Sequence, residues 1–196
     1  MLIWKDQVNE LSKKLCKTIF LVRNLKPIVG LNTILNCYHG YFQSALSYAI
    51  FTWGHSSHAK DIFALQRRCI RIIANLSYQE PCQSAFVSLK ILTLPCIYIL
   101  QCLSYVKRYE NRFVKHSNVH IHLTRNRENL QLNDLRLTRS RNAENYHCIK
   151  FYNALPRSIK MLQANLFYKK MKSYLITKAF YSFEDYLHND FSDFIS

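Results

Sequence analysis

Glycine and proline are scarce in this sequence, and this scarcity constrains the fold more than any other feature. The 196 residues include 3 Gly and 4 Pro, whereas average usage would give roughly 14 Gly and 10 Pro. Sheet-rich folds need many tight turns, which depend on Gly for positive φ and on Pro for a fixed φ. Gly30, Gly40 and Gly54 stand alone, so the clustered glycines of phosphate-binding loops and dinucleotide-binding folds are missing. The composition predicts an all-α protein.

Apolar residues recur at helical spacing along most of the chain. The clearest stripe lies in the segment 58–76, where the apolar positions are Ile62, Leu65, Cys69, Ile72 and Leu76. Further helices are predicted over 5–25, 32–53, 93–111, 143–154 and 165–179, with a short apolar segment at 82–91 and a last helical turn from Ser182. We expect Thr93 and Ser182 to be N-caps. Together these segments predict a small bundle of about six to seven helices.

Residues 113–142 break the helical pattern. They are polar and basic, and the alternation from Leu130 to Leu137 suits a minor hairpin. About 30 residues without helix indicate a functional arm or a junction. We therefore predict a helical bundle over 1–112, a basic arm or linker over 113–142 and a C-terminal helical region over 143–196.

The chain is strongly basic, with 27 Lys and Arg against 12 Asp and Glu, a formal charge of +15. Residues 107–178 hold 16 of the cations and four acids, a local charge of +12, whereas the C-terminal tail is acidic. Such a surplus favours an acidic partner, with nucleic acid first and an anionic membrane surface second. On the third predicted helix, Lys60, Arg67 and Arg71 fall on the side opposite the apolar stripe.

The cysteines and the apolar runs indicate where in the cell the protein is expected to be found. None of the seven cysteines belongs to a CxxC pair, and several lie inside apolar runs, so we expect buried, reduced thiols. The N-terminus is too short for a signal sequence, and the longest apolar runs, of about seven residues, are too short to span a bilayer. We expect an intracellular protein, nuclear or cytoplasmic, without a signal peptide or transmembrane segment.

Candidate catalytic and metal-binding residues are weakly supported. His55 and His58 lie three apart and His120 and His122 two apart, but no thiol pair accompanies them, so loop histidines are favoured over a zinc site. Two-metal phosphoryl transfer needs converging carboxylates, and the chain has no Asp-Asp pair. We expect no catalytic residue, no metal site and no cofactor in this chain.

Seven segments of the chain resemble short motifs that occur in the same order in one protein family. Ser47–Gly54 resembles that family's "SYGIxxWG" helix end, and Leu65–Ile73 resembles its "LQKRAIRII" helix. The others are Leu2–Asp6 with Leu11–Leu15, Leu89–Pro95 ("LxILxLP"), His122–Asn126 ("HxxxTR", with a spacing that differs by a residue), Phe151–Pro156 and Ala179–Ser182. Each motif is short, but their shared order over nearly the whole chain makes the resemblance specific. The chain resembles the non-LTR retrotransposon reverse transcriptases of the jockey group of arthropods.

The resemblance implies that this chain corresponds to the thumb and C-terminal region of an RNA-directed DNA polymerase. The family's Mg-binding carboxylates lie in a Tyr-x-Asp-Asp type motif that no residue here matches, so the chain is expected to be a truncated copy that is not an enzyme. In the family, thumb helices hold the RNA/DNA template–primer duplex by its backbone. The candidate contacts are Lys60, Arg67, Arg68 and Arg71, followed by His122, Arg125, Arg127, Arg139 and Arg141.

One alternative is a helical protein-interaction module that docks on the missing palm domain or on another protein. The apolar stripes of the first two predicted helices would then be partly exposed. Peripheral membrane binding is a third interpretation, but it requires a helix with a strong apolar face and aromatic anchors, and the helix around Lys169–Lys172 fits this poorly. The sequence leaves the oligomeric state open.

Overall fold

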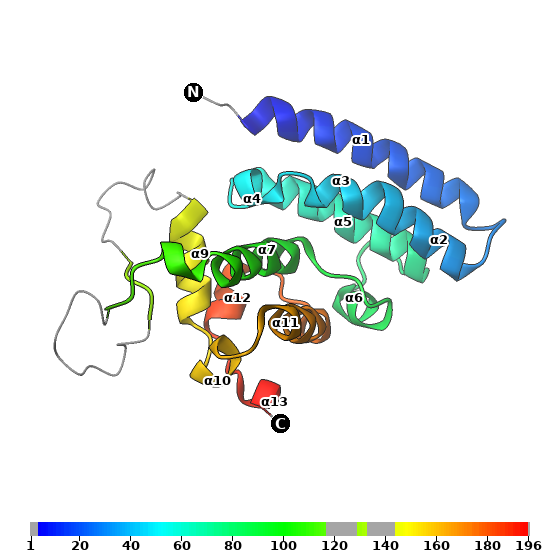
Figure 1. Cartoon of the computed structure of the whole chain (residues 1–196). Coiled ribbons are helices and arrows are strands. Elements are labelled where there is room, and N and C mark those ends of the chain that lie inside the picture. The colour runs from blue at the N-terminus through cyan, green and yellow to red at the C-terminus, as the bar shows by residue number, and fades with distance from the viewer. Residues whose placement is uncertain (1–3, 117–128, 133–143, 196) are drawn as a thin grey trace. The chain divides into compact units, whose positions relative to one another are not determined.

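The computed structural model describes residues 4–116, 129–132 and 144–195 of the chain, which form helices joined by short connections (Figure 1). The predicted all-α class is confirmed, because no strand is present among these residues. Six of the described helices have seven or more residues, in line with the predicted bundle of about six to seven.

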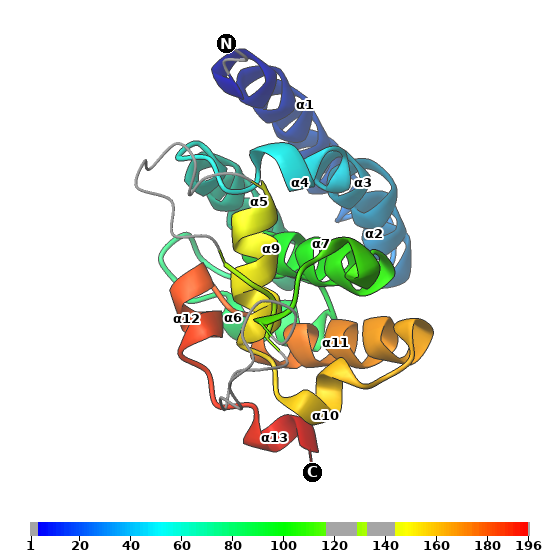
Figure 2. The same cartoon turned by 60° about the vertical axis from the view of Figure 1, so that its left-hand side comes forward.

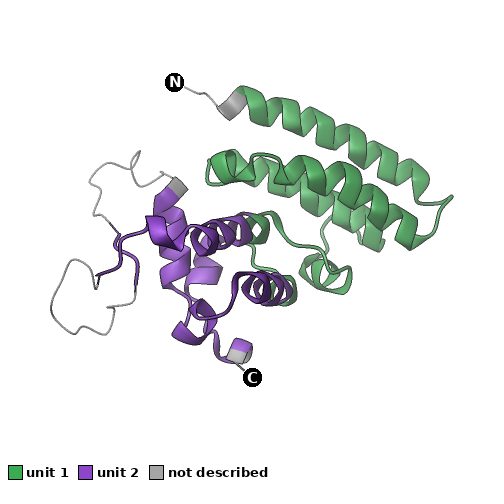
Figure 3. Cartoon of the chain, in the orientation of Figure 1, with its two compact units in different colours: residues 1–97, 176–181 green, residues 98–175, 182–196 purple. Residues whose placement is uncertain are grey.

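The chain divides into two compact units (Figure 3). Unit 1 comprises residues 1–97 and 176–181, and unit 2 comprises 98–175 and 182–196. The predicted domains 1–112, 113–142 and 143–196 were based on composition, whereas the two units are defined by contacts between residues. The predicted domain division stays a prediction.

Unit 1 is built around two long helices that lie side by side, α1 (Trp4–Leu25) and α5 (Ala59–Ala74) (Figures 1 and 2). Between them in sequence come α2 (Leu31–Cys37), the π-helical turn η1 (Tyr38–Gln43), α3 (Ser44–Ser47) and α4 (Ile50–Trp53). Following α5 are α6 (Gln83–Ser88) and the start of α7 (Leu94–Arg108). The helix α5 contacts both α1 and α6, and its buried face also includes Phe63 and Ile70, so that face is shifted around the helix from the predicted stripe. Ile62 and Cys69 are buried as expected, while Leu65 and Ile72 are only half-buried.

The segment 32–53 does not form the single helix expected from its spacing. The α-helix loosens into a π-helical turn at η1 and ends at Ser47, and Ala49 then adopts the left-handed conformation with φ 50°. The buried Trp53 donates a hydrogen bond from Nε1 to the Tyr48 carbonyl over 3.1 Å. This bond spans five residues and closes the turn around Ala49, and apolar spacing alone does not reveal a left-handed residue within a helical stripe.

A buried glutamine joins three segments of unit 1. The Gln66 side chain is fully buried on α5. Its Nε2 donates to the Tyr38 hydroxyl and to the Leu92 carbonyl, each over 2.9 Å, and its Oε1 accepts from the Leu94 backbone N–H over 2.8 Å. The amide therefore satisfies polar groups that would otherwise be buried without partners, at the point where α7 begins.

The start of α7 is capped as predicted. The Thr93 hydroxyl accepts a hydrogen bond from the Cys96 N–H over 3.3 Å and donates one to the Phe180 carbonyl over 2.6 Å. Phe180 belongs to the segment 176–181, which also receives hydrogen bonds from the Gln83 amide at the carbonyls of Lys178 and Ala179. These bonds explain why a short C-terminal segment belongs to unit 1.

Unit 2 contains the remainder of α7, η2 (Glu110–Arg112), α9 (Glu144–Asn153), α10 (Arg157–Lys160), most of α11 (Ala164–Lys178), α12 (Phe183–Leu187) and α13 (Ser192–Ile195). Its core is aromatic: Tyr98, Phe151 and Tyr186 are buried, and the Tyr186 hydroxyl donates to the Phe151 carbonyl over 3.2 Å. The predicted cap at Ser182 is confirmed as a capping box with Asp185.

Two short described parts of the predicted basic arm pair with each other in antiparallel fashion. Lys115 pairs with Leu130 in an isolated bridge. The Asn153 side chain brackets Leu130, accepting from its N–H over 2.9 Å and donating to its carbonyl over 2.8 Å. Most of the arm, including 133–137 of the expected hairpin, lies outside the described residues.

Lys160 is half-buried beside this pair. Its Nζ donates to Asn129 Oδ1 over 3.0 Å and to the Asn153 carbonyl over 3.2 Å, and it lies 5.6 Å from the centre of the Tyr152 ring. Burial lowers the pKa of Lys160 to about 8, because a charged ammonium loses hydration there.

We expect Gln66→Leu to lower the free energy of unfolding by roughly 3 kcal/mol, since it leaves the Leu92 carbonyl and the Leu94 N–H buried without partners. Urea unfolding followed by circular dichroism measures the loss. Gln79→Leu, at an exposed position, is the matched control and should change stability by less than about 0.5 kcal/mol. Equal effects of the two substitutions would show that the buried amide contributes nothing specific.

The lowered pKa of Lys160 predicts a pH dependence of stability. Between pH 8 and 10.5 the unfolded chain holds the Lys160 proton while the folded chain has released it, so stability should rise with pH. After a discount for partial exposure, we expect wild type to gain about 1–2 kcal/mol relative to Lys160→Met between pH 7 and 9.5. Urea midpoints across this range measure the difference, and Lys150→Met, at an exposed site on α9, should follow wild type. A constant difference between wild type and Lys160→Met would contradict the prediction.

Candidate nucleic-acid interface

Four of the predicted nucleic-acid contacts lie on α5, and they divide into two pairs. Lys60 and Arg68 are exposed, whereas Arg67 and Arg71 are half-buried. At 1.5 Å per residue, the exposed pair spans about 12 Å along the helix axis. That length corresponds to about three to four phosphates of one strand at roughly 3.4 Å per step.

The half-buried pair is held by the protein itself. The Arg67 guanidinium lies over the Phe63 ring, 5.1 Å from its centre. The Arg71 Nε donates to the Glu80 carbonyl over 2.9 Å, which ties the chain after α5 back to the helix. These two side chains therefore have structural roles, although their positive charges remain.

Tyr181 lies near Arg67 and Arg71 and feels their positive charge. Its ring meets the Phe63 ring edge-on at 5.1 Å between centres, and its hydroxyl is 3.3 Å from the Cys82 sulfur. Burial and the Cys82 contact raise the pKa of Tyr181, while the charges of Arg67 and Arg71 oppose the rise. The hydroxyl therefore keeps its proton at neutral pH, which leaves the positive charge of the two arginines uncompensated by a phenolate.

The remaining predicted contacts are His122, Arg125, Arg127, Arg139 and Arg141. All of them lie outside the described residues. Their role stays a prediction from the sequence.

Other cations stabilise the fold. Lys26 donates to the Ile72 carbonyl and to the Asn75 side chain, and so places a positive charge at the C-terminal end of α5. Lys107 donates to the Lys160 carbonyl over 2.6 Å and lies 3.4 Å from a Glu110 carboxylate oxygen. These lysines contribute to the net charge of the chain, but their side chains are already engaged in contacts within the protein.

Sequence reasoning missed a basic groove in unit 2. It is formed by the end of α7 and the start of α11, has a volume of about 580 Å³, and includes Arg108, Tyr168 and Lys169. About sixty residues separate its two sides in the sequence, so no local spacing could join them. The lack of acidic residues in both helices was the available signal.

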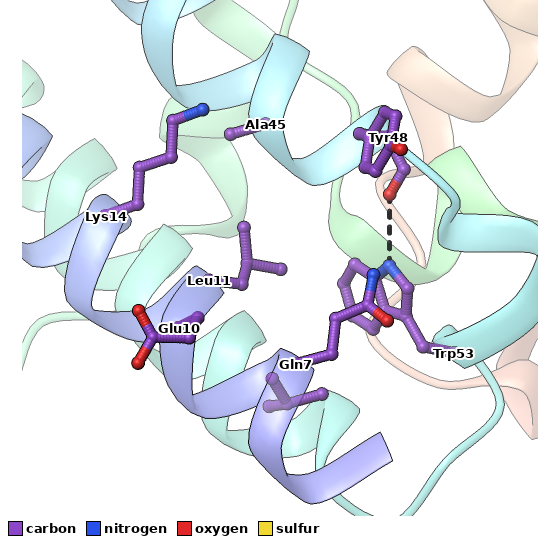
Figure 4. Close-up of a pocket in the computed structure, with 8 residues that line it drawn as sticks. Gln7, Glu10, Leu11, Lys14, Ala45, Tyr48 and Trp53 are labelled. Atoms are coloured by element: carbon purple, nitrogen blue, oxygen red, sulfur yellow. Dashed lines mark hydrogen bonds between the residues drawn. The ribbon is translucent and has the colours of Figure 1, made fainter. Parts of the chain in front are cut away.

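Unit 1 has a second concave site, of about 360 Å³, between α1 and the α3–α4 turn (Figure 4). Apolar side chains line much of it: Val8, Leu11, Ala45 and Trp53. Glu10 and Lys14 of α1 also line the site, and Trp53 is held to the Tyr48 carbonyl. This mixture suits a peptide or protein side chain better than a polyanion.

In the described part of the chain, no three His, Cys, Asp or Glu side chains are grouped so that they could hold a metal ion. All seven cysteines are free thiols, and five of them are buried, as expected for most. Burial raises the pKa of the Cys69 thiol to about 12, so that thiol is unreactive at neutral pH.

None of the described helices is both long and apolar enough to cross a membrane. Comparison with protein-family models, curated proteins and solved structures finds no match to the chain. The resemblance to retrotransposon reverse transcriptases therefore rests on the sequence motifs alone. The geometry independently identifies an exposed basic pair on α5 and a basic groove in unit 2.

Proposed function

We propose that this chain binds nucleic acid through basic helices, and that it is a non-enzymatic copy of the thumb and C-terminal region of a retrotransposon RNA-directed DNA polymerase. The observation that supports nucleic-acid binding best is the charge surplus. Twelve acidic side chains can neutralise at most twelve of the 27 cations one-to-one, which leaves 15. A surplus of this size is typical of proteins that contact a phosphate backbone.

Within unit 1, the contact surface is the exposed side of α5. Lys60 and Arg68 extend from a helix that α1 and α6 hold in place. Arg67 and Arg71 add fixed positive charge beside them without needing to move. Contacts from Lys and Arg to phosphates carry no sequence information, so we propose that binding depends little on sequence.

The absence of activity is part of the proposal. The chain contains no Asp-Asp pair, and its adjacent acids Glu184 and Asp185 lie at the start of α12. The Asp185 carboxylate accepts from the Ser182 N–H over 2.9 Å, which gives it a capping role. We propose no cofactor in this chain, although the parent polymerase would use Mg. The free thiols support a nuclear or cytoplasmic location, which we include in the proposal.

The test compares Lys60→Gln/Arg68→Gln with wild type for binding a labelled RNA/DNA duplex of about 16 base pairs, by fluorescence anisotropy over a salt series. Each lost phosphate contact reduces the slope of log K against log salt by about 0.9. We expect the slope to fall by about 1.8 and the affinity at low salt to fall about tenfold.

Lys17→Gln/Arg23→Gln, which removes two exposed cations from α1, is the matched control and should change both quantities less. Equal losses in the two variants would mean diffuse attraction instead of an α5 site. No binding by wild type at low salt would overturn the proposed function, and primer extension by the purified chain would overturn its non-enzymatic part.

A second candidate function, a protein-interaction module, is favoured by exposed apolar side chains in unit 1. Phe20 is 66% exposed on α1, and Ile28, Leu31 and Tyr41 are also largely exposed. Together with the cavity beside Trp53, they offer apolar surface to a protein partner such as the missing palm domain. Sedimentation tests this: a stable monomer with a cooperative melt and no self-association would count against it.

A further inference from the structure

The basic groove of unit 2 differs from the α5 surface in shape and in chemistry. It is concave, with a volume of about 580 Å³, within the range of pockets that enclose small ligands or single ligand groups. One side is the last turn of α7, with Lys107 and Arg108, and the other is the first two turns of α11. The groove lies wholly within unit 2.

The charge of the groove is not balanced locally. Neither α7 nor α11 contains an Asp or Glu. Lys107 is satisfied by Glu110 and by the Lys160 carbonyl. Arg108 and Lys169 are exposed, and no ion pair joins either of them to another described residue. The positive groups of Arg108 and Lys169 thus line the groove and can donate hydrogen bonds to a ligand.

An aromatic ring accompanies these cations. Tyr168 is 43% exposed and lines the groove, while its neighbour Phe167 is fully buried at the same place. The buried Phe167 anchors this turn of α11 in the core, so Tyr168 is presented on a fixed backbone. An exposed ring in the same groove as two cations is an arrangement that suits an unpaired base and its flanking phosphates.

We propose that this groove binds one or two nucleotides of a single-stranded nucleic acid, with phosphates held by Arg108 and Lys169 and a base stacked on Tyr168. A duplex keeps its bases stacked inside and cannot offer one to the ring. The proposed ligand is therefore distinct from the duplex proposed for α5, and neither proposal depends on the other.

The first experiment measures anisotropy with a labelled oligothymidylate of about ten nucleotides and, in parallel, with the RNA/DNA duplex. Arg108→Gln/Lys169→Gln should weaken oligothymidylate binding about tenfold and reduce its salt slope by about 1.4. Duplex binding should change less than threefold. The charge-matched control is again Lys17→Gln/Arg23→Gln, which should leave oligothymidylate binding within about twofold of wild type.

The second experiment isolates stacking from charge. Tyr168→Ala should weaken oligothymidylate binding about tenfold without changing the salt slope, and Tyr168→Phe should restore it, because the aromatic face is retained. Circular dichroism checks that each variant is folded, which we expect for substitutions of exposed side chains.

Specific outcomes would overturn the proposal. Unchanged oligothymidylate binding in the groove variants, alongside a loss in Lys60→Gln/Arg68→Gln, would remove the groove site and leave the α5 proposal standing. Thymidine monophosphate that binds as tightly as the oligonucleotide would make the groove a free-nucleotide pocket. Binding to vesicles of anionic phospholipid that requires Arg108 and Lys169, without oligothymidylate binding, would identify a membrane surface as the ligand.

Discussion

The hydrogen bonds of the Gln66 side chain are the interaction on which unit 1 most depends. A primary amide presents one acceptor and two donors, and here it bonds to the Leu92 carbonyl, the Leu94 N–H and the Tyr38 hydroxyl. The 92–94 backbone is buried at the point where α7 starts, so water cannot satisfy these groups. Without the amide, the turn into α7 would have to rearrange or leave polar atoms unpaired, at a cost of about 1–3 kcal/mol each.

That arrangement also explains where the sequence was informative and where it was not. The helices around α1, α5 and α11 were predicted within a few residues, and the caps at Thr93 and Ser182 were identified, because periodicity and capping act over a few positions. Gln66 looks like a polar interruption in an apolar helix, and its partners are 26 and 28 residues away. The break at Ala49 was missed for a different reason: the bond from Trp53 to the Tyr48 carbonyl spans only five residues, but apolar spacing carries no information about a left-handed backbone.

In the candidate site, too, local spacing predicted the position of the residues but not their contacts with distant parts of the chain. The spacing of Lys60, Arg67 and Arg71 placed them on one side of α5, but it could not tell which of them is held by the protein. Arg71 bonds to the Glu80 carbonyl and Arg67 lies over Phe63, so the freely exposed cations are Lys60 and Arg68. A count of basic residues therefore overstates the number of side chains that are free to contact a ligand. It still gives the net charge that sets the electrostatic field around the protein.

Arg108 and Lys169 are brought together only by folding, and this bears on how the two proposals relate. The α5 surface includes Arg68, which lies in the segment Leu65–Ile73, so the resemblance of that segment to a reverse-transcriptase motif is one of its supports. The groove of unit 2 has no motif behind it; it rests on a cavity, two exposed cations and a ring anchored through Phe167. A chain unrelated to any polymerase would still carry that groove. Single-strand binding that is lost in the groove variants would therefore establish an activity of this fold whatever its ancestry.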